Sequence, residues 1–421
     1  MSLPKNLTKP WSSQARLSLL FVWAALTLII AFSYQDPTMW SSFIQLNLSP
    51  ALLLTDYVEA FGASASLLNA GVVLIINVLI LLVLKMQLSG LLYAAIFTVY
   101  GFSFLGMNTV NLLPIYLGGF LYAKYMNLEF KAVVLISIIA GTVGPIISHV
   151  MFGYGVTSVF TIVLGSVVGI VLGFLVTPLG RHYLKFHDGF NLYNVGFTGG
   201  LIAILYDAIA RRLGFEAVRV RIIYEQHDVR LLILTVVSIL FFFIIGLLFE
   251  ENPFNHLKGI FKSSGRAISD FVVLGGFHAT HLNMALVGVM STVLVFMLGG
   301  VLNGLTLSGI FTIIGFGAFG KHPKNILPVF IGAIISTILT GLPLSSTTSI
   351  LYILFATTLA PIAGVYGFGW GMVAGFLHIF IVNHVGMFYS GLNLYSNGFA
   401  GGLGAGFLII LISLVQKEKT S

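Results

Sequence analysis

Long uninterrupted apolar runs constrain this chain more than any other feature. Runs such as 17–33, 156–178 and 231–249 are long enough to cross the roughly 30 Å hydrocarbon core of a bilayer as helices. Only helices and closed barrels span bilayers, and barrels need alternating strands of about ten residues, which these continuous runs do not supply. We therefore predict an all-α integral membrane protein that crosses the bilayer many times.

The composition supports a lipid environment. Charged residues make up 8% of the 421 positions and hydrophobic residues 58%, whereas soluble domains carry about 25% charge. The 20 basic residues cluster near the ends of apolar runs, which is typical of membrane topology signals rather than of a nucleic-acid partner. Cysteine is absent from the sequence, which excludes disulfides and thiolate metal sites.

Basic residues at the two termini indicate an orientation. Lys5, Lys9 and Arg16 precede the first apolar run, which we interpret as a retained helix rather than a cleaved signal peptide. Together with Lys417 and Lys419 they predict cytoplasmic termini in a bacterial cytoplasmic membrane.

The chain also contains an internal repeat. Residues 55–71 align with 269–285, residues 101–119 align with 315–333, and the phrase "GFNLYNVGFTGG" (189–200) returns as "GLNLYSNGFAGG" (391–402). We predict two tandem homologous repeats, 1–212 and 213–421, with residues 210–230 as a polar linker. Several apolar segments are short or interrupted by Gly and Pro, which predicts broken or re-entrant helices.

The number of crossings in each repeat decides how the two halves are related. An even number makes the halves parallel, whereas an odd number inverts them and leaves the linker outside. We favour parallel halves because the linker carries five arginines, which are costly to translocate: Arg211, Arg212, Arg219, Arg221 and Arg230.

The duplicated phrase is the leading candidate for a solute site. Gly-interrupted segments at corresponding positions of two halves are where transporters of this kind place their substrates. The alternative is helix packing by small residues, with Asn forming hydrogen bonds between helices, which explains the glycines well but the Asn-x-Tyr part poorly. The candidate residues are Asn191, Tyr193, Asn194, Gly196, Gly199, Asn393, Tyr395, Asn397, Gly398 and Gly401.

A second set of paired asparagines extends this candidate site. Asn69 and Asn283 begin long apolar runs, while Asn111 and Asn325 belong to an "N-[LI]-L-P" element. Asn can bind backbone groups that a proline frees, so we favour a role in breaking helices. Broken helices also bind substrates in transporters, so the four residues stay in the candidate set.

Repeated ionisable residues are candidates for ion coupling. Asp56 and Asp270 are equivalent, and a carboxylate at membrane depth usually marks an ion or proton route. The alternative is a helix N-cap or an interfacial position, since Thr55 and Ser269 precede them. His182 and His384 are also equivalent and suit proton handling or interfacial anchoring.

No sequence motif indicates a metal or a cofactor. His278 and His281 share a helix face but have no evident third ligand. Nucleotide-binding and hydrolase motifs are lacking in any credible context, so we predict neither a bound metal nor a cofactor.

The doubled "NLYN/NLYS…GF-x-GG" phrase and the paired "N-[LI]-LP" element carry a resemblance. Across nearly its full length the chain resembles a bacterial family of multi-pass membrane proteins catalogued only as a domain of unknown function. That resemblance implies no activity and no functional residues. The segment "LYNVGFTGGLIA" (192–203) is also similar to a turn and helix of urea channels, which slightly favours a conduit for a neutral solute.

These features favour a transporter or channel for a small polar solute, with a pathway where the two repeats meet. Movement would be passive or coupled to H⁺ or Na⁺. One alternative is an intramembrane enzyme, such as a lipid-modifying transferase that uses His and Asp. Another is a membrane scaffold that transports nothing. The sequence is also compatible with a homo-oligomer. The polar residues are duplicated rather than gathered in one half, which favours transport over an enzyme.

Overall fold

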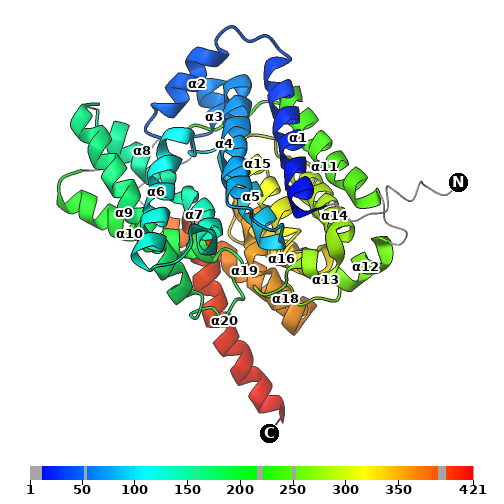
Figure 1. Ribbon diagram of the computed structural model, residues 1–421. Coiled ribbons are helices and arrows are strands. Elements are labelled where there is room, and N and C mark those ends of the chain that lie inside the picture. The colour runs from blue at the N-terminus through cyan, green and yellow to red at the C-terminus, as the bar shows by residue number, and fades with distance from the viewer. Residues whose placement is uncertain are drawn as a thin grey trace, which may run out of the picture.

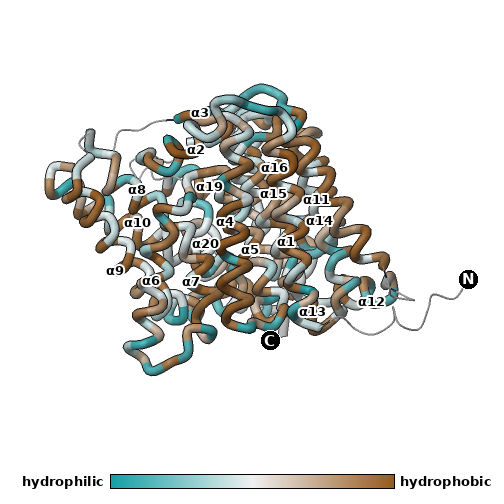
Figure 2. Tube along the Cα trace, turned by 45° about the horizontal axis from the view of Figure 1, so that its top comes forward, coloured by the Kyte–Doolittle hydropathy of each residue, from teal (hydrophilic) through white to brown (hydrophobic). Residues whose placement is uncertain are grey.

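The computed structural model describes residues 12–51, 55–155, 157–215, 221–248, 253–386 and 395–420. Within these ranges nine helices are long and apolar enough to cross a membrane. The long helices are hydrophobic along most of their length, and hydrophilic residues gather at the connections between them (Figure 2). The chain is therefore a multi-pass, all-α membrane protein, as its apolar runs predict.

Each repeat folds into the same succession of helices (Figure 1). In the described part of the first repeat they are α1 (Ser13–Phe32), α2 (Met39–Asn47), α3 (Tyr57–Phe61), α4 (Ala63–Val83), α5 (Gly90–Phe102), α6 (Thr109–Tyr125), α7 (Val134–Ala140), α8 (Gly144–Phe152), α9 (Val159–Tyr183) and α10 (Asn194–Arg212). In the second they are α11 (Val229–Leu247), α12 (Pro253–Ile260), α13 (Phe271–Leu274), α14 (Gly276–Met297), α15 (Gly304–Phe316), α16 (Pro323–Leu339), α17 (Thr347–Ala356), α18 (Ala360–Tyr366), α19 (Phe368–Val385) and α20 (Ser396–Thr420).

The short helices α5 and α15 pack against each other in the interior, and they run in opposite directions. A Cβ atom added to Gly90, at the start of α5, would lie 2.1 Å from the carbonyl oxygen of Ala318, just after α15. The equivalent contact in the other direction involves Gly304, at the start of α15, where an added Cβ atom would lie 2.4 Å from the carbonyl oxygen of Phe104. Equivalent helices that are antiparallel require a pseudo-two-fold axis perpendicular to them, so the two repeats are inverted.

The expectation of parallel halves is therefore wrong. It rested on the cost of moving the linker arginines across a membrane. Two of them are paired with acids: Arg211 Nε lies 2.9 Å from Asp207 Oδ2, and an Arg230 Nη2 lies 2.5 Å from Asp228 Oδ2. An inverted arrangement places the linker at the opposite end of the molecule from the start of α1.

Helices break at matching places in the two repeats. A 3₁₀ turn at Gly141–Val143 separates α7 from α8, and its equivalent at Thr357–Leu359, η4, separates α17 from α18. The connections that follow α5 and α15 turn at Gly106 and Gly320, whose φ angles of 80° and 90° favour glycine. The prediction of broken helices is confirmed.

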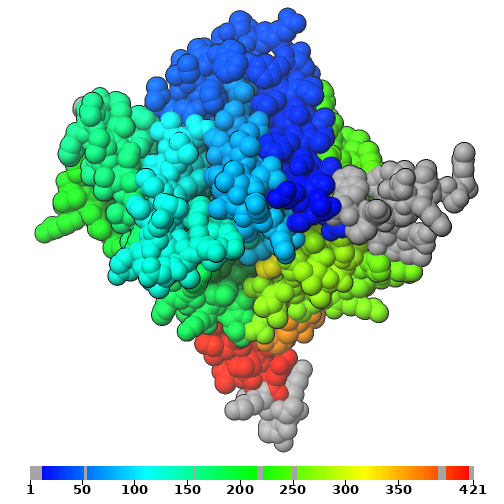
Figure 3. Space-filling view, in the orientation of Figure 1, coloured from blue at the N-terminus to red at the C-terminus, as the bar shows by residue number. Residues whose placement is uncertain are grey.

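Close helix contacts surround the central pair. A Cβ atom added to Gly173 of α9 would lie 2.1 Å from the carbonyl oxygen of Ile115 in α6. Its counterpart, Gly375 of α19, meets the carbonyl oxygen of Val329 in α16 at 2.0 Å. Small residues thus let backbones touch, as in other membrane bundles. The helices form one packed body from which α20 projects (Figure 3).

Candidate functional site: a cavity between the repeats

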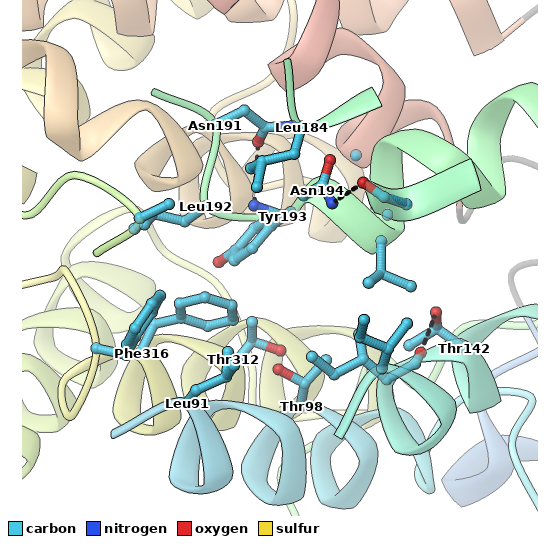
Figure 4. A pocket seen from close by; sticks show the side chains of 18 of the residues that line it. Leu91, Thr98, Thr142, Leu184, Asn191, Leu192, Tyr193, Asn194, Thr312 and Phe316 are labelled. Carbon is cyan, nitrogen blue, oxygen red and sulfur yellow. Dashed lines mark hydrogen bonds between the residues drawn. The ribbon is translucent and has the colours of Figure 1, made fainter. Parts of the chain in front are cut away.

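A cavity of about 240 Å³ lies where the two repeats meet. Helices α5 and α15 supply Thr98 and Thr312 to its wall, and the duplicated phrase supplies residues 191–196. The second copy of the phrase adds Tyr395, Asn397 and Gly398. Figure 4 shows the Asn191–Asn194 segment on one side of the cavity and the two threonines on the other.

The cavity surrounds the pseudo-two-fold axis. Residues that are equivalent in the two repeats and also touch each other must lie on that axis. A Cβ atom added to Gly398 would lie 2.4 Å from the carbonyl carbon of Gly196, its equivalent in the first repeat. The equivalent threonines Thr98 and Thr312 face one another across the antiparallel helices (Figure 4). All four residues line the cavity.

Several polar groups of the wall have no hydrogen-bond partner among the described residues. Thr98 Oγ1, Thr312 Oγ1, Asn191 Nδ2 and Asn397 Nδ2 are buried atoms without a hydrogen bond in the structure. Each would cost free energy if left unsatisfied, on the order of 1–3 kcal/mol. Apolar side chains such as Leu91, Leu135, Ile139 and Phe355 make up most of the remaining wall. A few convergent polar groups in an apolar cavity are typical of a small-molecule site.

The first copy of the phrase is held by the broken helix of the other repeat. The hydroxyl of Thr358 in η4 donates a hydrogen bond to Asn191 Oδ1. The same hydroxyl oxygen accepts a hydrogen bond from the Tyr193 amide at 2.9 Å. The amide of Leu192 donates to the Thr358 carbonyl at 3.0 Å. Asn191 therefore uses its oxygen for structure, while its Nδ2, beside the cavity, bonds to no residue in the described part of the chain.

Asn194 fixes the start of helix α10, whereas two glycines of the phrase lie outside the cavity wall. Asn194 Nδ2 donates to the carbonyl oxygen of Gly180 at 2.7 Å, and its Oδ1 lies 3.0 Å from His187 Nε2. Gly199 and Gly401 are not among the residues that line the cavity. A Cβ atom at Gly401 would lie 2.5 Å from the Thr358 side chain, so this glycine serves close packing. Asn393 lies outside the described residues.

Tyr193 joins the cavity to a buried lysine. Its hydroxyl accepts a hydrogen bond from Lys321 Nζ, which also donates to Thr357 Oγ1 at 2.7 Å. The same Nζ lies 4.4 Å from the centroid of the Tyr193 ring and 5.4 Å from that of Phe316. Both rings line the cavity, whereas Lys321 itself is fully buried behind them.

The other paired asparagines bind main chain. Asn69 Nδ2 donates to the carbonyl oxygens of Ser103 and Met107, at 2.7 and 2.8 Å. Asn283 makes the equivalent pair of bonds to Gly317 and Lys321, at 2.6 and 2.7 Å. Asn111 and Asn325 donate to the carbonyls of Gly106 and Gly320, both at 2.8 Å. All four fasten the turns after α5 and α15, so a role in binding solute stays a prediction.

Asp56 and Asp270 cap helices of both repeats. Asp56 accepts hydrogen bonds from the amides of Val58, Tyr224 and Gly304, at 2.9, 3.3 and 3.0 Å. Asp270 accepts from those of Val272, Val273 and Gly90, at 2.9, 3.3 and 2.9 Å. These contacts match the capping alternative, and ion coupling by these residues stays a prediction.

The candidate histidines are not among the residues that line the cavity. His182 and His384 are exposed near the ends of α9 and α19, and His384 Nδ1 lies 2.9 Å from the carbonyl oxygen of Phe380. His278 and His281 face different partners, the carbonyl oxygen of Ile245 and the hydroxyl of Tyr93, each at 2.9 Å. Proton handling by His182 and His384 stays a prediction.

Sequence comparison missed the threonine pair and Lys321. The threonines were detectable, because "IFTVYGF" (96–102) matches "IFTIIGF" (310–316) in the same register that aligns residues 101–119 with 315–333. Lys321 was harder to find, because its equivalent in the first repeat is Met107. A comparison that looks only for shared residues passes over a charge present in one copy.

The fold and the cavity define a class: a polytopic helical membrane protein of two inverted repeats that enclose a central cavity. The chain belongs to the family described as "Protein of unknown function (DUF1576)", whose model matches residues 35–212 and 249–414. The two matched regions fall on the two repeats. No curated protein and no solved structure matches the chain.

Proposed function

We propose that this protein is a transporter or channel for a small polar solute, which passes along the axis between the two repeats. The carrying observation is the cavity on that axis, where Thr98, Thr312, Asn191 and Asn397 present polar atoms that bond to none of the described residues. A solute that bonds to these atoms would recover the free energy that their burial costs. A scaffold needs no such cavity.

Inverted repeats suit this function because two similar halves can open alternately on the two sides of a membrane around one site. The glycine contact between Gly196 and Gly398 lets α10 and α20 cross closely at that site. Movement is passive or coupled to H⁺ or Na⁺. We place the protein in a bacterial cytoplasmic membrane.

The test is solute flux into proteoliposomes that contain the purified protein. A panel of small neutral and charged solutes, followed by light scattering during osmotic swelling, should identify at least one that enters faster than into empty vesicles. The double variant Thr98→Val, Thr312→Val removes both hydroxyls with little change of shape and should lower that flux at least about tenfold.

A matched control separates the cavity from general effects on packing. Thr292 of α14 is also buried with an unpaired Oγ1, but it does not line the cavity. Thr292→Val should leave the flux unchanged. The proposal fails if the vesicles admit nothing across the panel. It also fails if both valine variants behave like the natural protein.

A further inference from the structure

The cavity is electrically one-sided. No Asp or Glu stands among the described residues that line it, whereas Arg181 does. Arg181 is exposed at the end of α9. A solute entering beside it meets positive charge without a compensating carboxylate in the wall.

Lys321 is a second basic side chain, and it lies behind the wall. It is fully buried, and no ion pair joins it to a carboxylate within the part of the chain that the structure describes. Its partners are two hydroxyl oxygens, and its Nζ lies over the rings of Tyr193 and Phe316. Aromatic faces stabilise an ammonium group, and these two rings place Nζ one ring away from the cavity.

Two helix N-termini at the cavity add partial positive charge. Helix α10 begins at Asn194 and α20 at Ser396, and Asn194, Gly196, Asn397 and Gly398 all line the cavity. The N-terminal end of a helix carries partial positive charge. The Nδ2 atoms of Asn191 and Asn397, which bond to no described residue, are two further donors at this place.

We propose that the solute is a small monovalent anion and that Lys321 is the residue that determines this specificity. The inference rests on the proposed conduit and names its substrate class. An ammonium group that is buried without a counter-charge is costly, so Lys321 in its protonated form favours an anion in the cavity. An anion in the cavity would supply the missing counter-charge through low-dielectric surroundings, where charges interact strongly. A cation would meet repulsion from the same groups.

The repeat itself supplies the variant that tests this. Met107, the equivalent of Lys321, is fully buried in the first repeat, so Lys321→Met places a side chain that the same turn already accommodates. Lys324→Met is the control, because Lys324 is exposed three residues further on. Folding of both variants is checked by size-exclusion chromatography and thermal unfolding in detergent.

The assay uses full-length protein in liposomes of neutral lipid, with valinomycin to let K⁺ balance charge. The probes are potassium lactate and potassium nitrate as anions, glycerol and urea as neutral solutes, and choline chloride as an organic cation. We expect lactate or nitrate to enter fastest. Lys321→Met should lower the ratio of anion flux to neutral-solute flux at least about tenfold, and Lys324→Met should leave it unchanged.

Arg181 provides an independent arm if Lys321→Met does not fold. Arg181→Gln changes an exposed side chain and should lower anion flux severalfold, whereas Lys185→Gln, exposed on the same end and absent from the cavity wall, should not. If neutral solutes or choline enter and anions do not, the conduit stands and the anion inference falls. An anion preference that survives both charge-removing variants also overturns it, and if nothing enters, the conduit itself fails.

Discussion

The carboxylate of Asp56 in the first repeat lies 3.0 Å from the amide nitrogen of Gly304, the first residue of α15 in the second. The inverse contact joins Asp270 Oδ2 to the amide nitrogen of Gly90, the first residue of α5, at 2.9 Å. Each repeat thus caps the central short helix of the other. Acidic side chains at helix N-termini satisfy free N–H groups and complement the helix dipole.

Because each cap joins the two repeats, removing one should lower the stability of the whole protein and not only that of one helix. Asp56→Ala leaves the amides of Val58, Tyr224 and Gly304 without their shared acceptor. We expect the free energy of unfolding to fall by about 2 kcal/mol or more. Thermal unfolding in detergent measures this.

Glu59→Ala is the matched control, because Glu59 is an exposed acid three residues from Asp56. It should leave the unfolding temperature unchanged. Asp56→Asn keeps an acceptor oxygen and should lose less stability than Asp56→Ala. If Asp56→Asn instead abolishes gradient-driven uptake but unfolds at the same temperature as the natural protein, Asp56 acts in ion coupling and its capping role is secondary.

Two glycines of α19 predict opposite effects of the same substitution. A Cβ atom at Gly375 would lie 2.0 Å from the carbonyl oxygen of Val329, while Gly369 has nothing within 4 Å. Gly375→Ala forces α16 and α19 apart and should cost about 1–3 kcal/mol. Gly369→Ala should be neutral or stabilise by up to about 1 kcal/mol. Thermal unfolding of the two variants checks the contrast, and equal effects would contradict the close contact.

Much of this architecture is predictable from sequence, because lipid imposes simple rules. Apolar runs define the helices, and the repeated phrase locates the meeting point of the halves, where Gly196 touches Gly398. The partners of the asparagines are not predictable in this way. Asn69 and Asn191 are both asparagines in apolar surroundings, yet Asn69 Nδ2 binds two carbonyls and Asn191 Nδ2 binds none of the described residues.

The relation between the halves also escapes the sequence. It depends on whether an odd or an even number of segments crosses the membrane, and a single short helix changes that parity. Helix α5 has 13 residues, which span about 20 Å as a helix, less than the roughly 30 Å hydrocarbon core. Its antiparallel contact with α15 becomes visible only in three dimensions.

Acids at the linker end predict how stability depends on pH. Hydrogen bonds from the side chain and amide of Thr38 lower the pKa of Asp36 from its ordinary 3.8. Burial raises the pKa of Asp228, but the bonds and charge of Arg230 outweigh it, so that this pKa is also lowered from 3.8. A depressed pKa contributes stability that is complete above 3.8 and is lost as the pH falls through the folded value.

We therefore expect the unfolding temperature to fall on acidification below about pH 4. Arg230→Gln should lower the unfolding temperature at pH 7 and flatten its acid dependence, because Asp228 then titrates nearer its ordinary pKa. Arg212→Gln, at an exposed linker arginine, should change neither. If the unfolding temperature of Arg230→Gln falls on acidification as much as that of the natural protein, other carboxylates cause the fall.

The inverted fold predicts that the linker lies outside the cell. The start of α1 borders the connection to α5, since the Leu88 amide donates to Ser13 Oγ at 3.0 Å. The start of α11 borders the far end of α1, where the Arg230 guanidinium lies 5.1 Å from the Tyr34 ring centroid. Basic residues of the first end include Lys85, and positive residues favour the cytoplasm.

Because the chain has no cysteine, single-cysteine variants report sidedness without further engineering. His227→Cys, at an exposed position of the linker end, should react with a membrane-impermeant maleimide in intact cells. Lys85→Cys, exposed at the other end, should react only after the membrane is opened. The reverse pattern would place the linker in the cytoplasm and invert the orientation. Equal labelling of both positions in intact cells would contradict the placement of these residues on opposite sides of the membrane.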